Sequence, residues 1–82
     1  MKKTRQSAQK NIVGDRVREA RIALSPAVSQ DDLSGKLARL GVQITQTSLS
    51  KIEGKTRYVL DYEAAAIAKA LKVSVAWLYG EK

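Results

Sequence analysis

Apolar residues recur three and four positions apart in separate short segments of this chain, and this spacing constrains its fold more than any other feature. The spacing is that of one face of an α-helix, and no segment alternates apolar and polar residues over the length of a β-strand. The stripes are Val13, Val17, Ala20 and Leu24, then Leu33, Leu37 and Leu40, then Leu49 and Ile52, and finally Ala64, Ile67, Ala68 and Leu71. We therefore expect an all-α protein.

Capping and breaking residues bound the first two stripes. Asn11 can cap the first helix, and Pro26 ends it because the residue before a proline is pushed out of the helical conformation. Ser29 and Asp32 have the spacing of a capping box at the start of the second helix. Gly41 is a natural stop after it.

The third stripe lies in the sequence ITQTSLSKIEGK, which begins at Ile44. Thr45 is the expected N-cap, and Ile44 and Leu49 match a hydrophobic staple. Gly54 closes this helix after about two turns. The sequence therefore predicts a short third helix over about 46–53.

Two further helices complete the domain. The fourth begins at Asp61 or its neighbour, and the fifth runs from about Val75 to Tyr79 behind Ser74 as its cap. Five helices packed around one core predict a single compact domain over residues 11–82. Residues 1–10 carry four basic residues, no acid and no apolar period, so we expect a flexible arm. Such an arm is either an inert tail or a contact to the DNA backbone or minor groove.

Composition excludes several functional classes. The chain has no cysteine and no histidine, so thiolate metal sites, disulfides and the usual general base are absent. Its 8 carboxylates are scattered, so we expect neither an enzyme nor a bound cofactor. No apolar run approaches the ~20 residues of a membrane span, and we expect a cytoplasmic protein. The net charge of +7 and the pI near 10 favour a polyanionic partner, foremost nucleic acid; the alternative is a soluble protein that is simply basic.

The outward face of the third helix carries the side chains that suit such a partner. With Leu49 and Ile52 pointing inward, the outward and flanking positions belong to Gln46, Thr47, Ser50 and Lys51. Glutamine can pair with adenine, lysine can reach guanine, and threonine offers a hydroxyl and a methyl group to thymine. The alternative is an ordinary solvated helix face.

Polar residues flank this helix on both sides. Gln30 stands in the first turn of the second helix, where free backbone N–H groups favour a phosphate. Lys55, Thr56 and Arg57 follow the third helix and can hold backbone oxygens, and Thr45 at its start is grouped with them as a phosphate-binding candidate. A base-reading helix between phosphate contacts is the arrangement of a helix-turn-helix.

At these residues the sequence resembles a known family. The stretch RIALSPAVSQDDLSGKLARLGVQITQTSLSKIEGK, followed by EAAAIAKALKVSVAWLYG, is similar to the lambda-repressor-like, or XRE/Cro-type, helix-turn-helix domain. The resemblance covers roughly Val13 to Gly80. It implies a five-helix DNA-binding fold in which the second and third helices form the helix-turn-helix. The stretch from Gln30 to Gln46 is longer than in the compact form of the family, so the second helix or the turn must be longer.

The resemblance also implies roles for individual residues. The base readers are Gln46, Thr47 and Lys51, with Ser50 beside them, and the phosphate contacts are Gln30, Lys55 and Arg57. Arg21 and Glu53 are implied to form a partly buried ion pair that ties the first helix to the recognition helix.

These features predict a sequence-specific regulator of transcription, foremost a repressor, that binds a palindromic operator as a homodimer. The alternative is a protein-interaction module such as an antitoxin, with a protein partner in place of DNA or beside it. Two interpretations stay open for the C-terminal cluster Trp77, Leu78 and Tyr79. It packs into the core, or part of it lies exposed with Tyr58, Val59 or Leu60 and forms a dimer contact.

Overall fold

The computed structural model describes residues 9–81 of the chain. Within that range it contains five α-helices and no β-strand. The helices are α2 (Gly14–Ala23), α3 (Gln30–Arg39), α4 (Gln46–Glu53), α5 (Asp61–Leu71) and α6 (Val75–Leu78). The prediction of an all-α domain is confirmed for this part of the chain, and all five expected helices are present.

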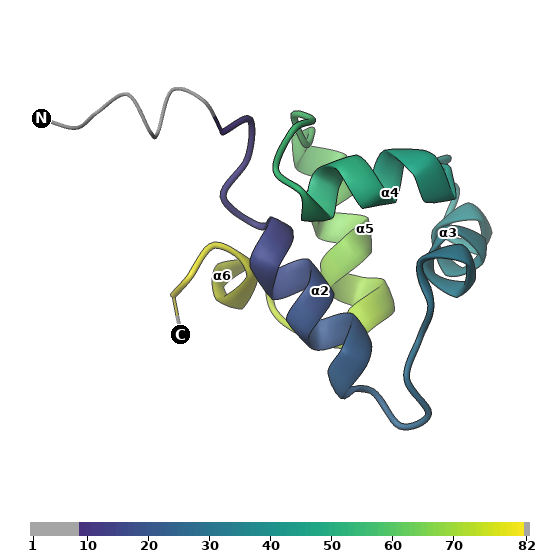
Figure 1. Cartoon of the computed structure of the whole chain (residues 1–82). Coiled ribbons are helices and arrows are strands. Elements are labelled where there is room, and N and C mark those ends of the chain that lie inside the picture. Colours follow the sequence, from purple (N-terminus) through teal and green to yellow (C-terminus); the bar gives the residue numbers. More distant parts are fainter. Residues whose placement is uncertain (1–8, 82) are drawn as a thin grey trace, which may run out of the picture.

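The helices pack around one another so that α4 lies across one end of the molecule (Figure 1). Its first turn lies beside α3, and its last turn lies above the start of α2. Helix α5 runs behind α2, and the short α6 packs against both. Helix α3 has ten residues, and a six-residue connection, 40–45, leads from it to α4. The extra length between Gln30 and Gln46 is thus accommodated in α3 and this connection.

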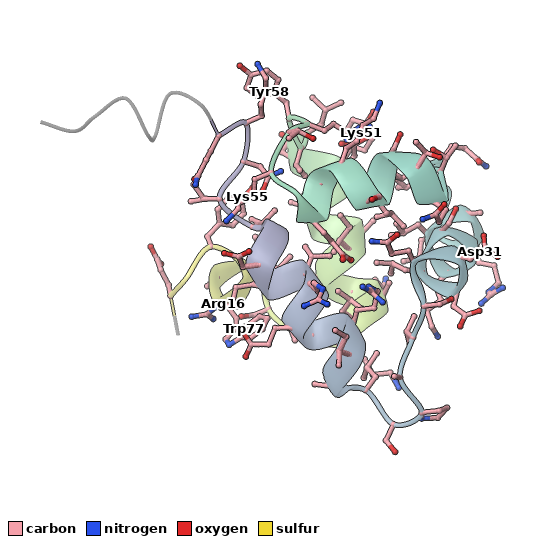
Figure 2. The ribbon with its side chains drawn as sticks, in the orientation of Figure 1. Arg16, Asp31, Lys51, Lys55, Tyr58 and Trp77 are labelled. Carbon is pink, nitrogen blue, oxygen red and sulfur yellow. The ribbon has the colours of Figure 1, made fainter. Side chains whose placement is uncertain are left out.

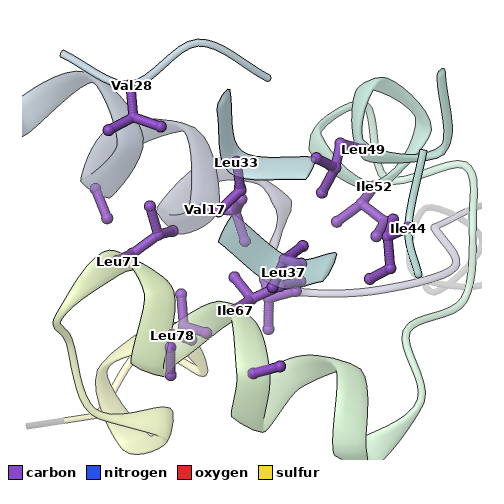
Figure 3. Packing of buried hydrophobic residues seen from close by; sticks show 14 residues of the cluster. Val17, Val28, Leu33, Leu37, Ile44, Leu49, Ile52, Ile67, Leu71 and Leu78 are labelled. Atoms are coloured by element: carbon purple, nitrogen blue, oxygen red, sulfur yellow. The ribbon is translucent and has the colours of Figure 1, made fainter. Parts of the chain in front are cut away.

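One cluster of apolar side chains forms the core (Figure 3). Members from every helix are fully buried, among them Val17, Leu37, Leu49, Ile67 and Leu78. Burial of such side chains is the main favourable contribution to folding.

Leu40 is an exception to the predicted stripes, and the prediction that it is buried is wrong. It is 41% exposed because α3 ends one residue earlier, at Arg39. The chain then turns at Gly41, whose φ of +84° is one that glycine adopts without strain.

Side-chain caps stand at three of the predicted positions. The Ser29 hydroxyl accepts a hydrogen bond from Asp32 N at 2.9 Å, and the Asp32 carboxylate accepts one from Ser29 N, so the capping box is present. Thr45 accepts from Ser48 N at 3.1 Å, and Ser74 accepts from Trp77 N at 3.0 Å. These contacts explain why the starts of α3, α4 and α6 could be read from the sequence.

Asn11 differs from its prediction, because α2 starts at Gly14 rather than directly after Asn11. Asn11 Oδ1 still accepts hydrogen bonds from Val13 N and Gly14 N. Its amide donates to two distant carbonyl groups, those of Ile52 and Arg57, at 3.1 and 2.8 Å. Asn11 is therefore a link between the start of α2 and the end of α4.

The predicted arm over residues 1–10 falls mostly on residues 1–8, which lie outside the described residues. Lys10 is described, and its N–H donates to Lys55 O at 3.0 Å. Lys10 therefore contacts the segment that follows α4. None of the helices within residues 9–81 combines the length and the apolar character needed to cross a membrane.

Candidate nucleic-acid interface

Helix α4 has a polar outer face because its apolar residues are buried in the core. Leu49 and Ile52 are fully buried. Gln46, Thr47, Ser50 and Lys51 are exposed, and Lys51 projects outward from the molecule (Figure 2). Both residues of the predicted staple, Ile44 and Leu49, are buried in the core cluster. This arrangement exposes the four predicted base readers to solvent.

Thr45 is predicted to bind phosphate, but in the structure its hydroxyl forms hydrogen bonds at the start of α4. The hydroxyl accepts from Ser48 N and donates its proton to Ser48 Oγ at 3.1 Å. A hydroxyl has one proton to donate, so none is left for a phosphate oxygen. Thr45 is a helix cap in this geometry.

Glu53 is the one acidic residue of α4, and its side chain is turned into the protein, where it is 5% exposed. Its carboxylate accepts from Arg21 Nε at 2.7 Å and from Arg21 Nη2 at 2.9 Å. Arg21 Nη1 also donates to Val28 O at 2.9 Å. The hydrogen bonds to Glu53 raise the pKa of Arg21. The pairing implied by the resemblance is therefore present, and it keeps a negative charge off the outer face of α4.

A chain of hydrogen bonds leads from this ion pair to the outer face. Gln30 Nε2 donates to Glu53 Oε1 at 3.1 Å, and Gln30 Oε1 accepts from Gln46 Nε2 at 2.6 Å. Because an ionised carboxylate only accepts, Glu53 dictates which end of the Gln30 amide faces it, and Gln30 in turn orients Gln46. Gln46 keeps its Oε1 and one N–H group available.

This chain gives Gln30 a different role from the predicted one. Its carbonyl oxygen and one N–H are already used, and Asp31 lines the same shallow hollow of about 410 Å³ beside Gln30 and Gln46. Arg21 lines the hollow as well, but its guanidinium is paired with Glu53. The geometry therefore favours Gln30 as a positioning residue for Gln46 over a phosphate contact.

Lys55 follows α4 in the left-handed conformation, with a φ of 63°. Its N–H bonds to Ile52 O, and that of Thr56 bonds to Lys51 O, which closes the end of the helix. Lys55 Nζ lies 2.9 Å from Asp15, whose side chain is 80% exposed. The Lys55 side chain is only 26% exposed, but its partner is open to solvent, so a phosphate can reach the lysine in place of Asp15. The Thr56 hydroxyl is exposed and holds a 3.3 Å hydrogen bond to Lys51 O.

Arg57 was predicted to bind phosphate, and the structure directs it inward instead. Its guanidinium donates to both carboxylate oxygens of Glu63, at 3.0 and 3.1 Å. The Glu63 side chain is 5% exposed and also accepts from Leu60 N. The hydrogen bonds from Arg57 lower the pKa of Glu63, and the same bonds raise the pKa of Arg57. The structure therefore pairs Arg57 with Glu63, and a phosphate contact by Arg57 stays a prediction.

Sequence reasoning missed two features of this region. Gly14 lies so close to the end of α4 that an added Cβ would come within 2.3 Å of Ile52 O. Lys10 Nζ lies over the Tyr58 ring, 4.9 Å from its centroid. The glycine in the first turn of α2 is a sequence signal for the close approach of the two helices. No sequence pattern pairs Lys10 with Tyr58, because the contact joins segments 48 positions apart.

Two interpretations were open for the C-terminal cluster, core packing and an exposed contact surface, and its residues differ in which of them they fit. Leu78 is fully buried, and Trp77 is half-buried beneath Arg16, whose guanidinium carbon lies 4.5 Å from the ring (Figure 2). Tyr79 is 39% exposed. It lines a surface hollow of about 430 Å³ that also includes Ile12 and Val59. Core packing is thus correct for Leu78, and Tyr79 lies exposed.

Searches against protein-family models and against curated proteins find no match to this chain. The geometry of α4 and of its flanking segments therefore carries the functional proposal.

Proposed function

We propose that this protein is a sequence-specific, double-stranded-DNA-binding regulator of transcription. In this proposal α3, the connection 40–45 and α4 form a helix-turn-helix, and α4 is the recognition helix in the major groove. The observation that carries it is the outer face of α4. That face bears four exposed hydrogen-bonding side chains, and the one acid of the helix is buried against Arg21.

Each residue of the face has a chemical role. Gln46 retains one acceptor and one donor, the pair that adenine N6 and N7 require. Lys51 can reach guanine O6 and N7. Thr47 offers its methyl group to thymine, and Ser50 can bond to any base edge. Gln30 contributes to base recognition indirectly, because its hydrogen bond orients the Gln46 amide.

The sequence-independent part of the affinity comes from basic side chains beside α4. Lys55 lies at the end of the helix, and the net charge of +7 adds a long-range attraction to DNA. Phosphate contacts of this kind set the position of a protein on the duplex. Occupation of a promoter would then block polymerase and repress transcription.

We further propose that two copies bind a palindromic operator. A two-fold dimer places two copies of α4 in successive major grooves, about 34–36 Å apart. Palindromy of the selected sites, with half-sites one helical turn apart, is therefore the signature of a dimer.

Selection from a random duplex library by the purified protein at ~150 mM salt tests the proposal, because non-specific attraction is already weakened there. We expect a palindromic consensus. Thr47→Ala and Lys51→Ala should each relax defined positions of that consensus. Lys69→Ala is the matched control, since Lys69 is exposed on α5 and should leave the consensus unchanged. Recovery of unenriched DNA, with binding that simply declines with salt, would refute sequence-specific reading.

A protein-interaction module, such as an antitoxin, is the second candidate. The observation that favours it is the exposure of Ile12, at 66%, and of Tyr79 around one surface hollow. Exposed apolar patches on small proteins often mark contacts to other proteins. The selection experiment separates the two candidates, because a pure interaction module returns no consensus.

A further inference from the structure

The segment that precedes α2 is fixed against the far end of α4. Lys10 N donates to Lys55 O at 3.0 Å. The Asn11 side-chain amide donates to Ile52 O and Arg57 O, while its carbonyl oxygen accepts from the start of α2. These bonds hold Lys10 beside the loop that follows the proposed recognition helix, so the position of this lysine is defined by the fold.

The ammonium group of Lys10 lies over the ring of Tyr58. Lys10 Nζ lies 4.9 Å from the centroid of the Tyr58 ring, a cation–π distance. Tyr58 is 66% exposed and Lys10 is also exposed. Within residues 9–81 neither Lys10 nor the Tyr58 hydroxyl has a carboxylate or other side-chain hydrogen-bond partner. The ring therefore orients the lysine while leaving its N–H groups open to solvent.

Both groups lie on the side of the molecule from which α4 would contact DNA. Figure 2 shows Tyr58 and Lys51 projecting from the same edge. Tyr58 lies beyond the last turn of α4, in the loop that leads to α5. A duplex seated against Lys51 would thus bring its sugar–phosphate backbone to Tyr58.

We propose that Lys10 and Tyr58 together bind one phosphate of the DNA backbone beyond the C-terminal end of α4. The inference rests on the proposed function. The lysine ammonium and the tyrosine hydroxyl are both donors that recur in phosphate contacts. Two donors from separate segments can grip the two free oxygens of one phosphodiester. The contact carries no sequence information and sets the register of α4 in the groove.

The salt dependence of DNA binding tests this contact directly. Each phosphate neutralised by a cation contributes about 0.9 to the slope of log K against log salt concentration. Lys10→Gln should therefore lower the magnitude of the slope by about 0.9. Between 50 and 200 mM salt this corresponds to about 3.5-fold less loss of affinity than in the wild type. The reduction should be the same on the selected operator and on unrelated DNA.

Two variants of Tyr58 separate its hydroxyl from its ring. Tyr58→Phe keeps the ring under Lys10 and should weaken binding without changing the salt slope. Tyr58→Ala removes the support of the lysine as well, so it should weaken binding further. Lys69→Gln is the matched control, because this exposed lysine lies on α5, away from the proposed contact. The melting temperature of each variant shows that it is folded.

Three results would overturn the inference. A salt slope that Lys10→Gln leaves unchanged shows that Lys10 neutralises no phosphate. A change in sedimentation mass in Tyr58→Ala shows that the ring contacts a second copy of the chain instead of DNA. Wild-type protein that binds no DNA at any salt concentration defeats both the inference and the proposed function. Failure of sequence selection alone defeats only the proposed function, since the slope can still be measured on unrelated DNA.

Discussion

Removal of the Glu53 carboxylate should destabilise the fold far more than any change on the outer face of α4. Glu53 is 5% exposed and its partner Arg21 is 12% exposed, and three hydrogen bonds converge on the carboxylate. In Glu53→Ala the guanidinium keeps only its bond to Val28 O. Loss of one partner of a buried pair costs ~3–5 kcal/mol, because the other charge is left without compensation.

That loss is large for a domain of this size. Total stability of an 82-residue domain is about 4–12 kcal/mol. At about 4–8 °C per kcal/mol, the melting temperature should fall by about 12–40 °C. Thermal unfolding followed by circular dichroism measures this shift. Glu19→Ala is the control, since this exposed acid on α2 should change stability by less than about 0.5 kcal/mol.

The double variant Arg21→Met/Glu53→Leu tests the physical reason for the shift. Replacing a buried pair by apolar residues of similar size is often neutral or stabilising, so the double variant should melt well above Glu53→Ala. A Glu53→Ala protein that melts within a few degrees of the wild type would refute the reasoning. So would a double variant that shows the sum of the two single losses.

Three further predictions concern the neighbourhood of α4. Gly14→Ala should destabilise the fold by about 1–3 kcal/mol in urea denaturation, because its Cβ would meet the carbonyl groups at the end of α4. Gly35→Ala, where nothing lies within 4 Å, should instead stabilise by up to ~1 kcal/mol, and equal effects would contradict the explanation. Lys55→Gly should stabilise the fold by about 1 kcal/mol, because glycine adopts the left-handed backbone conformation of this residue without strain. The same variant should bind DNA more weakly in a titration. Binding at wild-type strength would show that Lys55 is not part of the interface. Acid should also lower stability through Glu63. Because Arg57 lowers the pKa of Glu63 from its ordinary 4.5, the contribution of this pair is complete above about pH 4.5 and is lost as pH falls through the lowered pKa. Melting temperatures measured from pH 6 to about pH 3 should fall less steeply for Glu63→Gln, and parallel profiles would contradict this assignment.

The helices and their starts could be predicted from the sequence because the interactions that define them are local. A capping hydroxyl and the N–H it accepts from are three residues apart, as at Ser29, Thr45 and Ser74. The outer face of α4 followed in the same way from the burial of Leu49 and Ile52. Leu40 was misassigned because the stripe continues one residue past the end of the helix.

The partners of charged residues could not be predicted from periodicity alone. Arg57 has the sequence context of a phosphate contact, and only the packing of α5 brings Glu63 against it. Gln30 has the context of a helix start, and only the meeting of α3 with α4 joins it to Glu53 and Gln46. The pairing of Arg21 with Glu53 was implied by the family resemblance, not by spacing.

The sequence by itself determined that this chain is helical, where most of its helices begin, and which side of α4 faces water. Those properties depend on residues within one or two turns of each other, which the chain keeps close in any fold. The tertiary structure decided which polar groups remain available to a ligand. It buried the charges of Glu53 and Glu63 against arginines, turned Gln30 toward Gln46, and set Lys10 on Tyr58. Each of these contacts joins different segments of the chain, and a long-range hydrogen bond or ion pair forms only where packing of the core brings its partners within reach.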